Sequence, residues 1–422
     1  MEKLQKRVLT LVRYALSPEE SLPALPDDVP YRQILDCADT QQVIPLLYYG
    51  ACKTPNFLFS PVFGMFTSRA GAVIAHSTRQ LEGFDRLTAR FEAEGIDYMP
   101  VKGATLKRLY PQPEMRTMGD CDILIRKRQA HEADRIMREL GYSLQESTNH
   151  VREYINEERM VIELHIKLLP DGEIDLEPYY GDGWWTARPV PDHPHRYEMR
   201  PEDHYVFLFA HFVKHFRGVG AGIKFVIDFH VFEQAYPDMD MTYVRNELTK
   251  LGLDEFFDNI RRTVAVWFDD AEPDEKTEYL TNRLFGNAVF GSRDRALVSE
   301  AYRRTKAEEA KGERASDATR RRRKWFELFF LPYSAMKEKY PVLEHWAILL
   351  PLFWIVRGFD ILFFHRQKIN SVESSMENIS QESVDAYRAE INYMGLDKQM
   401  KPLEPGTHGK GWKKKSSATE TK

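Results

Sequence analysis

Two aspartates separated by one residue, Asp120 and Asp122, are the strongest candidates for chemistry in this chain. The apolar residues that follow them predict a strand, and alternate side chains of a strand share one face. Two carboxylates about 6–7 Å apart on that face repel each other. A divalent cation removes the repulsion, and Mg²⁺ fits because it leaves positions for phosphate oxygens and water. The pattern therefore predicts a metal site, although paired aspartates on solvated loops are also common.

A third carboxylate strengthens this interpretation. In the segment 161–168 the apolar residues Ile162 and Leu164 alternate with Glu163 and His165, so one face of a strand is core and the other is polar. If the two strands are neighbours, three carboxylates converge, as two-metal phosphoryl-type transfer requires. We predict Asp120, Asp122 and Glu163 as catalytic and metal-binding residues. The alternative is an amphipathic edge strand with ordinary surface groups.

A lysine–glycine turn precedes the acidic pair. Residues 96–101 predict a strand that ends at Lys102 and Gly103, and a short helix follows. A glycine here lets phosphates approach the backbone, whose N–H groups can hold anions. The predicted nucleotide-binding residues are Lys102, Gly103, Ala104 and Arg116. Taken one at a time, each of them is more typical of a structural or surface role, and their position next to the acidic pair carries the interpretation.

Basic residues gather further along the chain. His204, His211, Lys214 and His215 are spaced by seven, three and four, which places them on one helical face. The pair His211 and His215 has metal-binding spacing, but residues 212–214 lack the glutamate of a zinc-protease helix. A substrate-facing surface is the main interpretation and a zinc site the alternative. The predicted substrate-facing residues are His165, His211, Lys214, His215 and Asp228. Asp228 could equally pair with Lys224.

The bulk composition is ordinary. The 422 residues are 43% hydrophobic and 29% charged, with a formal net charge of −5, which gives no global bias toward nucleic acid or anionic membranes. Three scattered cysteines (Cys37, Cys52 and Cys121) suit neither a disulfide framework nor a zinc knuckle and favour a reducing cytoplasm. The first residues have no uninterrupted apolar core, so no signal peptide is expected.

The elements predict an α+β fold, a small mixed β-sheet flanked by N-terminal and C-terminal helical regions. Strands are expected at 96–101, 121–125, 142–146, 150–156 and 161–168, and helices at 130–140, 201–216, 222–236, 241–250, 254–269, 275–284 and 380–392. The predicted divisions are a helical region 1–95, an α/β core 96–200, a helical substrate-facing region 201–300, a charged helix or linker 301–324, a helical region 325–395 and a disordered basic tail 396–422.

Two further segments contribute no residue to the predicted site. The run from Arg320 to Lys324 is typical of a solvated helix face, with phosphate or membrane-surface binding as the alternative. The block from Trp346 to Phe364 is apolar, but Pro351, Arg357 and Asp360 interrupt it, so we predict no membrane span. A buried helix pair is the main interpretation of the block, and peripheral membrane contact is the alternative.

The motifs together resemble the uncharacterised bacterial nucleotidyltransferase family, which belongs to the polymerase-β-like superfamily. The resemblance lies in Lys102-Gly103-Ala104, Tyr110-Pro111, Arg116, Gly119-Asp120-Cys121-Asp122, Gly141-Tyr142, Glu163-Leu164-His165, His211 to His215 and Ile227-Asp228. It implies that Gly103 marks the nucleotide-binding turn and that Asp120, Asp122 and Glu163 bind metal. The superfamily usually has Gly-Ser or Gly-Gly at the turn and more often Asp as the third carboxylate.

The resemblance implies an enzyme that uses Mg²⁺ (or Mn²⁺) and a nucleoside triphosphate (NTP) such as ATP. It would transfer a nucleoside monophosphate to a hydroxyl or phosphate of a sugar, a peptide or protein, or a nucleic acid. Two other classes stay open. One is a catalytically silent nucleotide-binding or regulatory module of the same fold. The other is a scaffold at a membrane, based on the basic run and the apolar block.

Overall fold

The structure is a computed structural model of the whole chain. It describes residues 1–19, 22–25, 30–169, 176–287, 293–310, 326, 330–331, 333, 336, 340, 342–364, 381–398 and 400. The chain divides into two compact units, and all the predicted site residues lie in the first. The first unit comprises Met1–Phe216, Gly220–Gly291 and the chain from Met394, and the second comprises Arg217–Val219 and Ser292–Tyr393. The finer six-part division stays a prediction.

Within the described residues of the first unit, seven strands form one mixed sheet in the order β3-β4-β5-β2-β1-β7-β6. The strands are β1 (Tyr98–Pro100), β2 (Asp120–Ile125), β3 (Ser143–Ser147), β4 (Val151–Ile155), β5 (Val161–His165), β6 (Ala187–Val190) and β7 (His193–Met199). The pair that carries the candidate carboxylates, β2 and β5, is central and parallel. The other neighbours of these two strands, β1 and β4, run antiparallel to them. The expected α+β fold is therefore confirmed.

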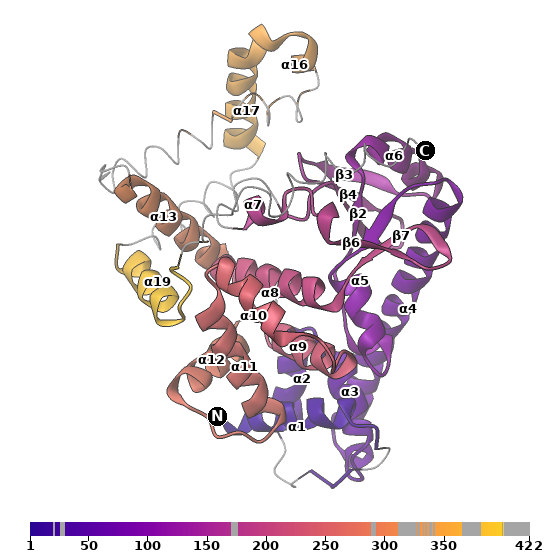
Figure 1. The fold of residues 1–422 in the computed structure, drawn as a ribbon, viewed down its shortest axis with the longest axis vertical. Helices are drawn as coiled ribbons and strands as arrows, with labels where there is room; N and C mark the ends of the chain where they lie inside the picture. The colour runs from indigo at the N-terminus through magenta and orange to yellow at the C-terminus, as the bar shows by residue number, and fades with distance from the viewer. Residues whose placement is uncertain are drawn as a thin grey trace, which may run out of the picture. The chain divides into compact units, whose positions relative to one another are not determined.

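One face of this sheet is packed and the other is polar. Cys121 and Ile123 of β2 and Ile162 and Leu164 of β5 are fully buried in a common core. Helices α4 (Phe63–Ala93) and α6 (Ala130–Glu139) supply further side chains of that core and cover this face of the sheet (Figure 1). Because side chains alternate along a strand, burying these four residues turns Asp120, Asp122, Glu163 and His165 toward the opposite face.

Helices precede and follow the sheet in the first unit (Figure 1). Before it come α1 (Lys3–Leu16), α2 (Tyr31–Thr40), α3 (Ile44–Cys52) and α4, and after β1 comes the four-residue α5 (Gly103–Leu106). After it come α8 (Pro201–Arg217), α9 (Lys224–Ala235), α10 (Met241–Lys250), α11 (Asp254–Phe268) and α12 (Glu275–Gly286). Helix α8 is buried on most of its surface, with phenylalanines 207, 209, 212 and 216 at most 1% exposed. Its polar residues His211, Lys214 and His215 therefore lie on the one side of the helix that is only partly buried.

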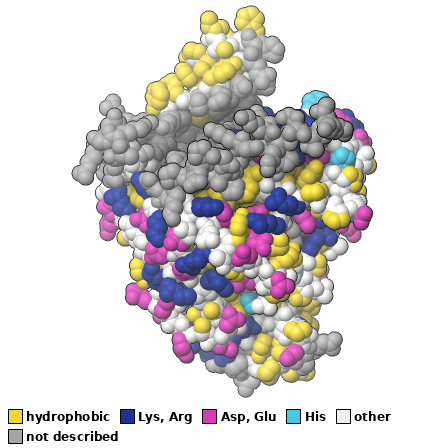
Figure 2. All heavy atoms as spheres, viewed as in Figure 1, with side chains coloured by type: hydrophobic (Ala, Val, Ile, Leu, Met, Phe, Trp, Pro, Cys, Tyr) yellow, Lys and Arg dark blue, Asp and Glu magenta, His cyan; other side chains and the backbone are white. Residues whose placement is uncertain are grey.

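The described part of the second unit contains α13 (Arg293–Ala310), α16 (Val342–His345), α17 (Leu350–Phe364) and α19 (Gln381–Tyr393). Figure 2 shows apolar side chains gathered on the segment of α16 and α17, where Trp346 is 61% exposed and Ile348 83% exposed. The predicted buried helix pair is therefore wrong. The segment lacks enough packing partners among the described residues to bury its apolar side chains. No helix among those residues has the length and apolarity to cross a membrane.

Most predicted elements are confirmed, and two strands were missed. Strands β6 and β7 form a hairpin whose second strand pairs in parallel with β1. Their prolines, histidines and arginines give no alternating apolar pattern, because the hairpin is largely exposed. The basic run 320–324 and the tail from residue 401 lie outside the described residues.

Candidate metal and nucleotide site

The three predicted carboxylates lie on adjacent strands. Strands β2 and β5 pair in a register that sets Asp122 directly opposite Glu163, and Asp120 opposite Val161. Side chains opposite each other on paired strands lie close together. The Asp120, Asp122 and Glu163 side chains all face one cavity of about 220 Å³. Strand pairing therefore brings together residues more than 40 positions apart in sequence.

Three donor atoms are close enough to hold one cation. They come from Asp122, Glu163 and His165, and all lie within 4.8 Å of one another. The Nε2 atom of His165 is 2.8 Å from Asp122 Oδ1 and 3.1 Å from Glu163 Oε2. The sequence placed His165 on a substrate-facing surface and Asp120 among the metal ligands. In the structure the histidine joins the donor group, and Asp120 lies beside it at the cavity.

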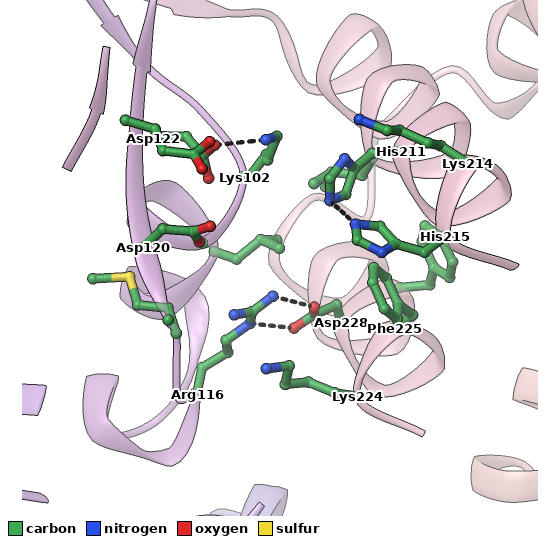
Figure 3. Close-up of a pocket in the computed structure, with 17 residues that line it drawn as sticks. Lys102, Arg116, Asp120, Asp122, His211, Lys214, His215, Lys224, Phe225 and Asp228 are labelled. Atoms are coloured by element: carbon green, nitrogen blue, oxygen red, sulfur yellow. Dashed lines mark hydrogen bonds and ion pairs between the residues drawn. The ribbon is translucent and has the colours of Figure 1, made fainter. Parts of the chain in front are cut away.

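The Lys102 ammonium lies 2.5 Å from Asp122 Oδ1, and the two form a largely buried ion pair (Figure 3). Lys102 has φ 53° and ψ −125°, a conformation that side chains rarely adopt and that normally favours glycine. The strained residue of the turn is thus the lysine rather than Gly103. At Gly103 the constraint is space instead, since a Cβ there would lie 3.2 Å from Met118 Cβ and 3.4 Å from Arg116 Nη1, and these neighbours would have to shift slightly to admit it.

The two aspartates differ in their electrostatics. The neighbouring Asp122 carboxylate and burial raise the pKa of Asp120 to about 6. Burial also acts to raise the pKa of Asp122, but the Lys102 ammonium and His165 outweigh it and hold that pKa well below its usual range. For His165, burial and Lys102 act to lower the pKa, and the hydrogen bonds to Asp122 and Glu163 raise it on balance. Of the two carboxylates, Asp120 is therefore the one whose ionised form is destabilised by the repulsion between them.

Arg116 is held by a buried network. Its Nε and Nη2 atoms donate to the two carboxylate oxygens of Asp228 at 3.1 and 2.8 Å, and its Nη1 atom donates to the Thr117 carbonyl at 2.7 Å. The Tyr110 hydroxyl also donates to Asp228, at 2.7 Å. Asp228 was predicted to face substrate or to pair with Lys224. The structure shows it paired with Arg116, at the wall of the cavity (Figure 3).

Helices α8 and α9 form the wall that faces the carboxylates. His211 and His215 lie with their Nε2 atoms 3.1 Å apart, and Lys214, Lys224 and Phe225 line the same wall (Figure 3). Burial lowers the pKa of both histidines, that of His215 to about 4, and burial together with Arg116 lowers the pKa of Lys224 to about 7. The cavity therefore has an acidic wall and a wall of imidazoles and amines.

One predicted nucleotide-binding residue, Ala104, lies away from the cavity, and one buried lysine near the cavity was not predicted. Ala104 is 3% exposed and packs in the core behind the turn. The sequence analysis gave no role to Lys107, which is fully buried and donates to Ser77 Oγ and to the Arg116 carbonyl. This lysine fixes the loop that precedes the acidic pair. A lysine in a short segment between apolar residues offers no pattern from which that role could be predicted.

His204, which shares a helical face with the cavity histidines in the sequence, is a core residue. It is 6% exposed, and its ring packs edge-on against Phe232. Its Nε2 atom is buried and finds no hydrogen-bond partner in the part of the chain that the structure describes. Burial lowers the pKa of His204 to about 4.

This burial predicts acid sensitivity. Because the folded pKa lies below the ordinary value of 6.5, the stabilising contribution is complete above pH 6.5 and is lost as the pH falls toward about 4. The difference between the ordinary and the folded pKa of His204 corresponds to about 3 kcal/mol of unfolding free energy for this one group. We expect the urea midpoint to fall between pH 7.5 and pH 5, and His204→Phe to reduce that fall. An unchanged pH dependence in the variant would show that His204 keeps its ordinary pKa in the folded protein.

The mixed sheet has carboxylates on two adjacent parallel strands, facing a cavity beside a lysine–glycine turn, and the nucleotidyltransferase interpretation of the sequence depended on these two strands being neighbours. Comparison with protein-family models agrees. Residues 27–269, more than half of the 422-residue chain, match the family described as uncharacterised nucleotidyltransferase, and the chain belongs to that family. Neither the curated proteins nor the solved structures contain a match to this chain.

Proposed function

We propose that this protein is a metal-dependent nucleotidyltransferase, which moves a nucleoside monophosphate from an NTP to a hydroxyl or phosphate of an acceptor. The observation that carries the proposal is the register of β2 and β5, which sets Asp122 opposite Glu163 at a cavity that Asp120 also lines. Family membership supports the same chemistry. The acceptor is a sugar, a peptide or protein, or a nucleic acid, and the cytoplasm is the proposed compartment.

Asp120, Asp122 and Glu163 would hold the divalent cation, Mg²⁺ or Mn²⁺. Three carboxylates at one cavity form a site that needs positive charge, and the raised pKa of Asp120 reflects this need. The bound cation supplies neutralisation of phosphate charge and a lower pKa for an attacking hydroxyl.

The remaining residues of the cavity would bind and orient the nucleotide. Lys102 stands at the turn, and Lys214 and Lys224 stand on the opposite wall, so a triphosphate between the walls meets amines on both sides. The three guanidinium nitrogens of Arg116 are all engaged by Asp228 and Thr117. Arg116 therefore acts by holding the loop of residues 116–119 rather than by contacting phosphate itself.

A second candidate is a nucleotide-binding module without turnover. One observation favours it, the ion pair in which Lys102 already neutralises Asp122, a carboxylate that a metal requires. In this case the protein binds an NTP and releases no pyrophosphate. Peripheral membrane contact through the exposed Trp346 and Ile348 stays a separate prediction.

The test is to incubate the protein with each of the four NTPs and Mg²⁺ or Mn²⁺, and to measure nucleotide binding and pyrophosphate release. We expect one or more NTPs to bind with metal, and EDTA to weaken binding by at least about tenfold, since the metal bridges phosphate and carboxylates. Pyrophosphate release with a candidate acceptor supports the enzyme, and binding without release across all acceptor classes supports the silent module. Failure to bind any NTP contradicts both.

A further inference from the structure

We propose that His165 is a direct nitrogen ligand of the metal ion and that it makes this site select Mn²⁺ over Mg²⁺. The inference rests on the proposed function only in assuming that a divalent cation binds at Asp122 and Glu163. It concerns which ion the site takes and which side chain decides this.

The two distances from the imidazole nitrogen to the carboxylate oxygens fit a shared cation. Two neighbouring ligands of an octahedral ion, each about 2.1 Å from the metal, lie about 3.0 Å apart. His165 Nε2 is 2.8 Å from Asp122 Oδ1 and 3.1 Å from Glu163 Oε2. The imidazole nitrogen is therefore as close to each carboxylate as neighbouring ligands of one ion are.

The histidine is fixed in this position by the sheet. His165 is the last residue of β5, two residues after Glu163, so both side chains leave the same face of one strand. It is 4% exposed, and its Nδ1 atom is buried and has no hydrogen-bond partner within the described residues. The polar contacts of the ring therefore pass through Nε2, which is directed at the two carboxylates.

Nitrogen ligation has a consequence for metal choice. Mg²⁺ binds through oxygen ligands and keeps much of its water. Imidazole suits first-row transition ions such as Fe²⁺, Ni²⁺ and Zn²⁺, and Mn²⁺ is the member of that series that carboxylate oxygens also suit. A site in which one imidazole joins the carboxylates thus gains affinity for Mn²⁺ that it does not gain for Mg²⁺. A site of three carboxylates, which the sequence predicted, gives no such preference.

The competing interpretation is that His165 only positions Asp122. In that case Nε2 carries a proton and donates to the carboxylates, and the metal contacts oxygen atoms alone. Both interpretations predict that losing His165 harms activity, so activity does not separate them. The identity of the atoms bound to the ion separates them.

The experiment measures metal binding by the free protein. Titration with Mn²⁺, followed by the electron paramagnetic resonance of the unbound ion, gives its affinity, and competition with Mg²⁺ gives the ratio of the two affinities. We expect wild type to bind Mn²⁺ at least about tenfold more tightly than Mg²⁺. Electron spin-echo spectra of bound Mn²⁺ should show modulation from a directly coordinated nitrogen.

Two substitutions and one control complete the test. His165→Gln supplies an amide oxygen in place of the imidazole, so it should keep Mg²⁺ binding and lose both the nitrogen modulation and most of the preference for Mn²⁺. His165→Leu supplies no donor and should weaken both ions. His150→Ala removes a ring whose centre is 6.5 Å from that of His165, and it should leave the modulation and the preference unchanged.

The outcomes separate this inference from the proposed function. If Mn²⁺ binds wild type without nitrogen modulation and with an affinity equal to that of Mg²⁺, the inference is overturned and the metal-dependent function stands. If neither ion binds wild type, both fail. The wild-type spectrum decides the question even if a His165 variant does not fold.

Discussion

Asp120→Asn should abolish pyrophosphate release and at the same time raise the melting temperature of the metal-free protein. The loss of activity should be at least about 10³-fold, because the cation that this carboxylate helps to hold contributes several kcal/mol of transition-state stabilisation. A gain in stability together with a loss of activity marks a residue that is present for function rather than for folding.

The gain in stability follows from the raised pKa of Asp120. Because the folded pKa is about 6 and the ordinary value is 3.8, the ionised carboxylate destabilises the fold, partially above pH 3.8 and fully above pH 6. The difference corresponds to at most about 3 kcal/mol. Solvent at the open cavity reduces it to roughly 1 kcal/mol, or about 2 °C. Asparagine removes this penalty at pH 7.5 and has no effect at pH 3.5.

Asp122→Asn provides the contrast. It should abolish pyrophosphate release to a similar degree but lower the melting temperature, because Asp122 is the partner of Lys102 and of His165. Without that partner, the largely buried Lys102 ammonium loses its ion pair, on a residue whose backbone is already strained. Calorimetry with and without Mn²⁺ adds a third measurement, since metal should stabilise wild type and neither variant. Opposite stability effects with equal loss of activity are expected, and wild-type activity in either variant would remove that aspartate from the mechanism.

Of the substitutions considered, Asp228→Asn should produce the largest loss in the free energy of unfolding. It leaves the buried Arg116 guanidinium without a charged partner, and breaking such a pair from one side costs about 3–5 kcal/mol. The Arg116 and Asp228 side chains are only 10% and 6% exposed, so water does not replace the lost interaction. We expect a lower urea midpoint and weaker nucleotide binding, because Arg116 holds the loop that carries the acidic pair.

The protein contains a matched control for this substitution. Arg245 and Asp258 form an ion pair that also joins two guanidinium nitrogens to both carboxylate oxygens, but on the surface, with side chains 50% and 42% exposed. Exposed pairs contribute about 0–1 kcal/mol. Asp258→Asn should therefore change the urea midpoint little. Equal destabilisation by the two substitutions would show that burial of the Arg116 pair is not what makes it important.

The sequence by itself determined most of the elements and which carboxylates share a strand face. The spacing of Asp120 and Asp122 puts both on one strand face, and the alternation around Glu163 does the same for β5. These are local properties, because side-chain direction along a strand has a fixed period of two. The helices after residue 200 could also be predicted, since their apolar residues recur with helical spacing.

Only the tertiary structure decided which groups meet. The parallel pairing of β2 with β5 brings Glu163 opposite Asp122, and no local pattern specifies which strands pair. The same pairing brings His165, which the sequence placed on a substrate-facing surface, within 2.8 Å of Asp122. A separate contact, between α9 and the loop before β2, pairs Asp228 with Arg116 across 112 residues. Contacts of this kind depend on packing between distant segments, and their energies are absent from any short stretch of sequence.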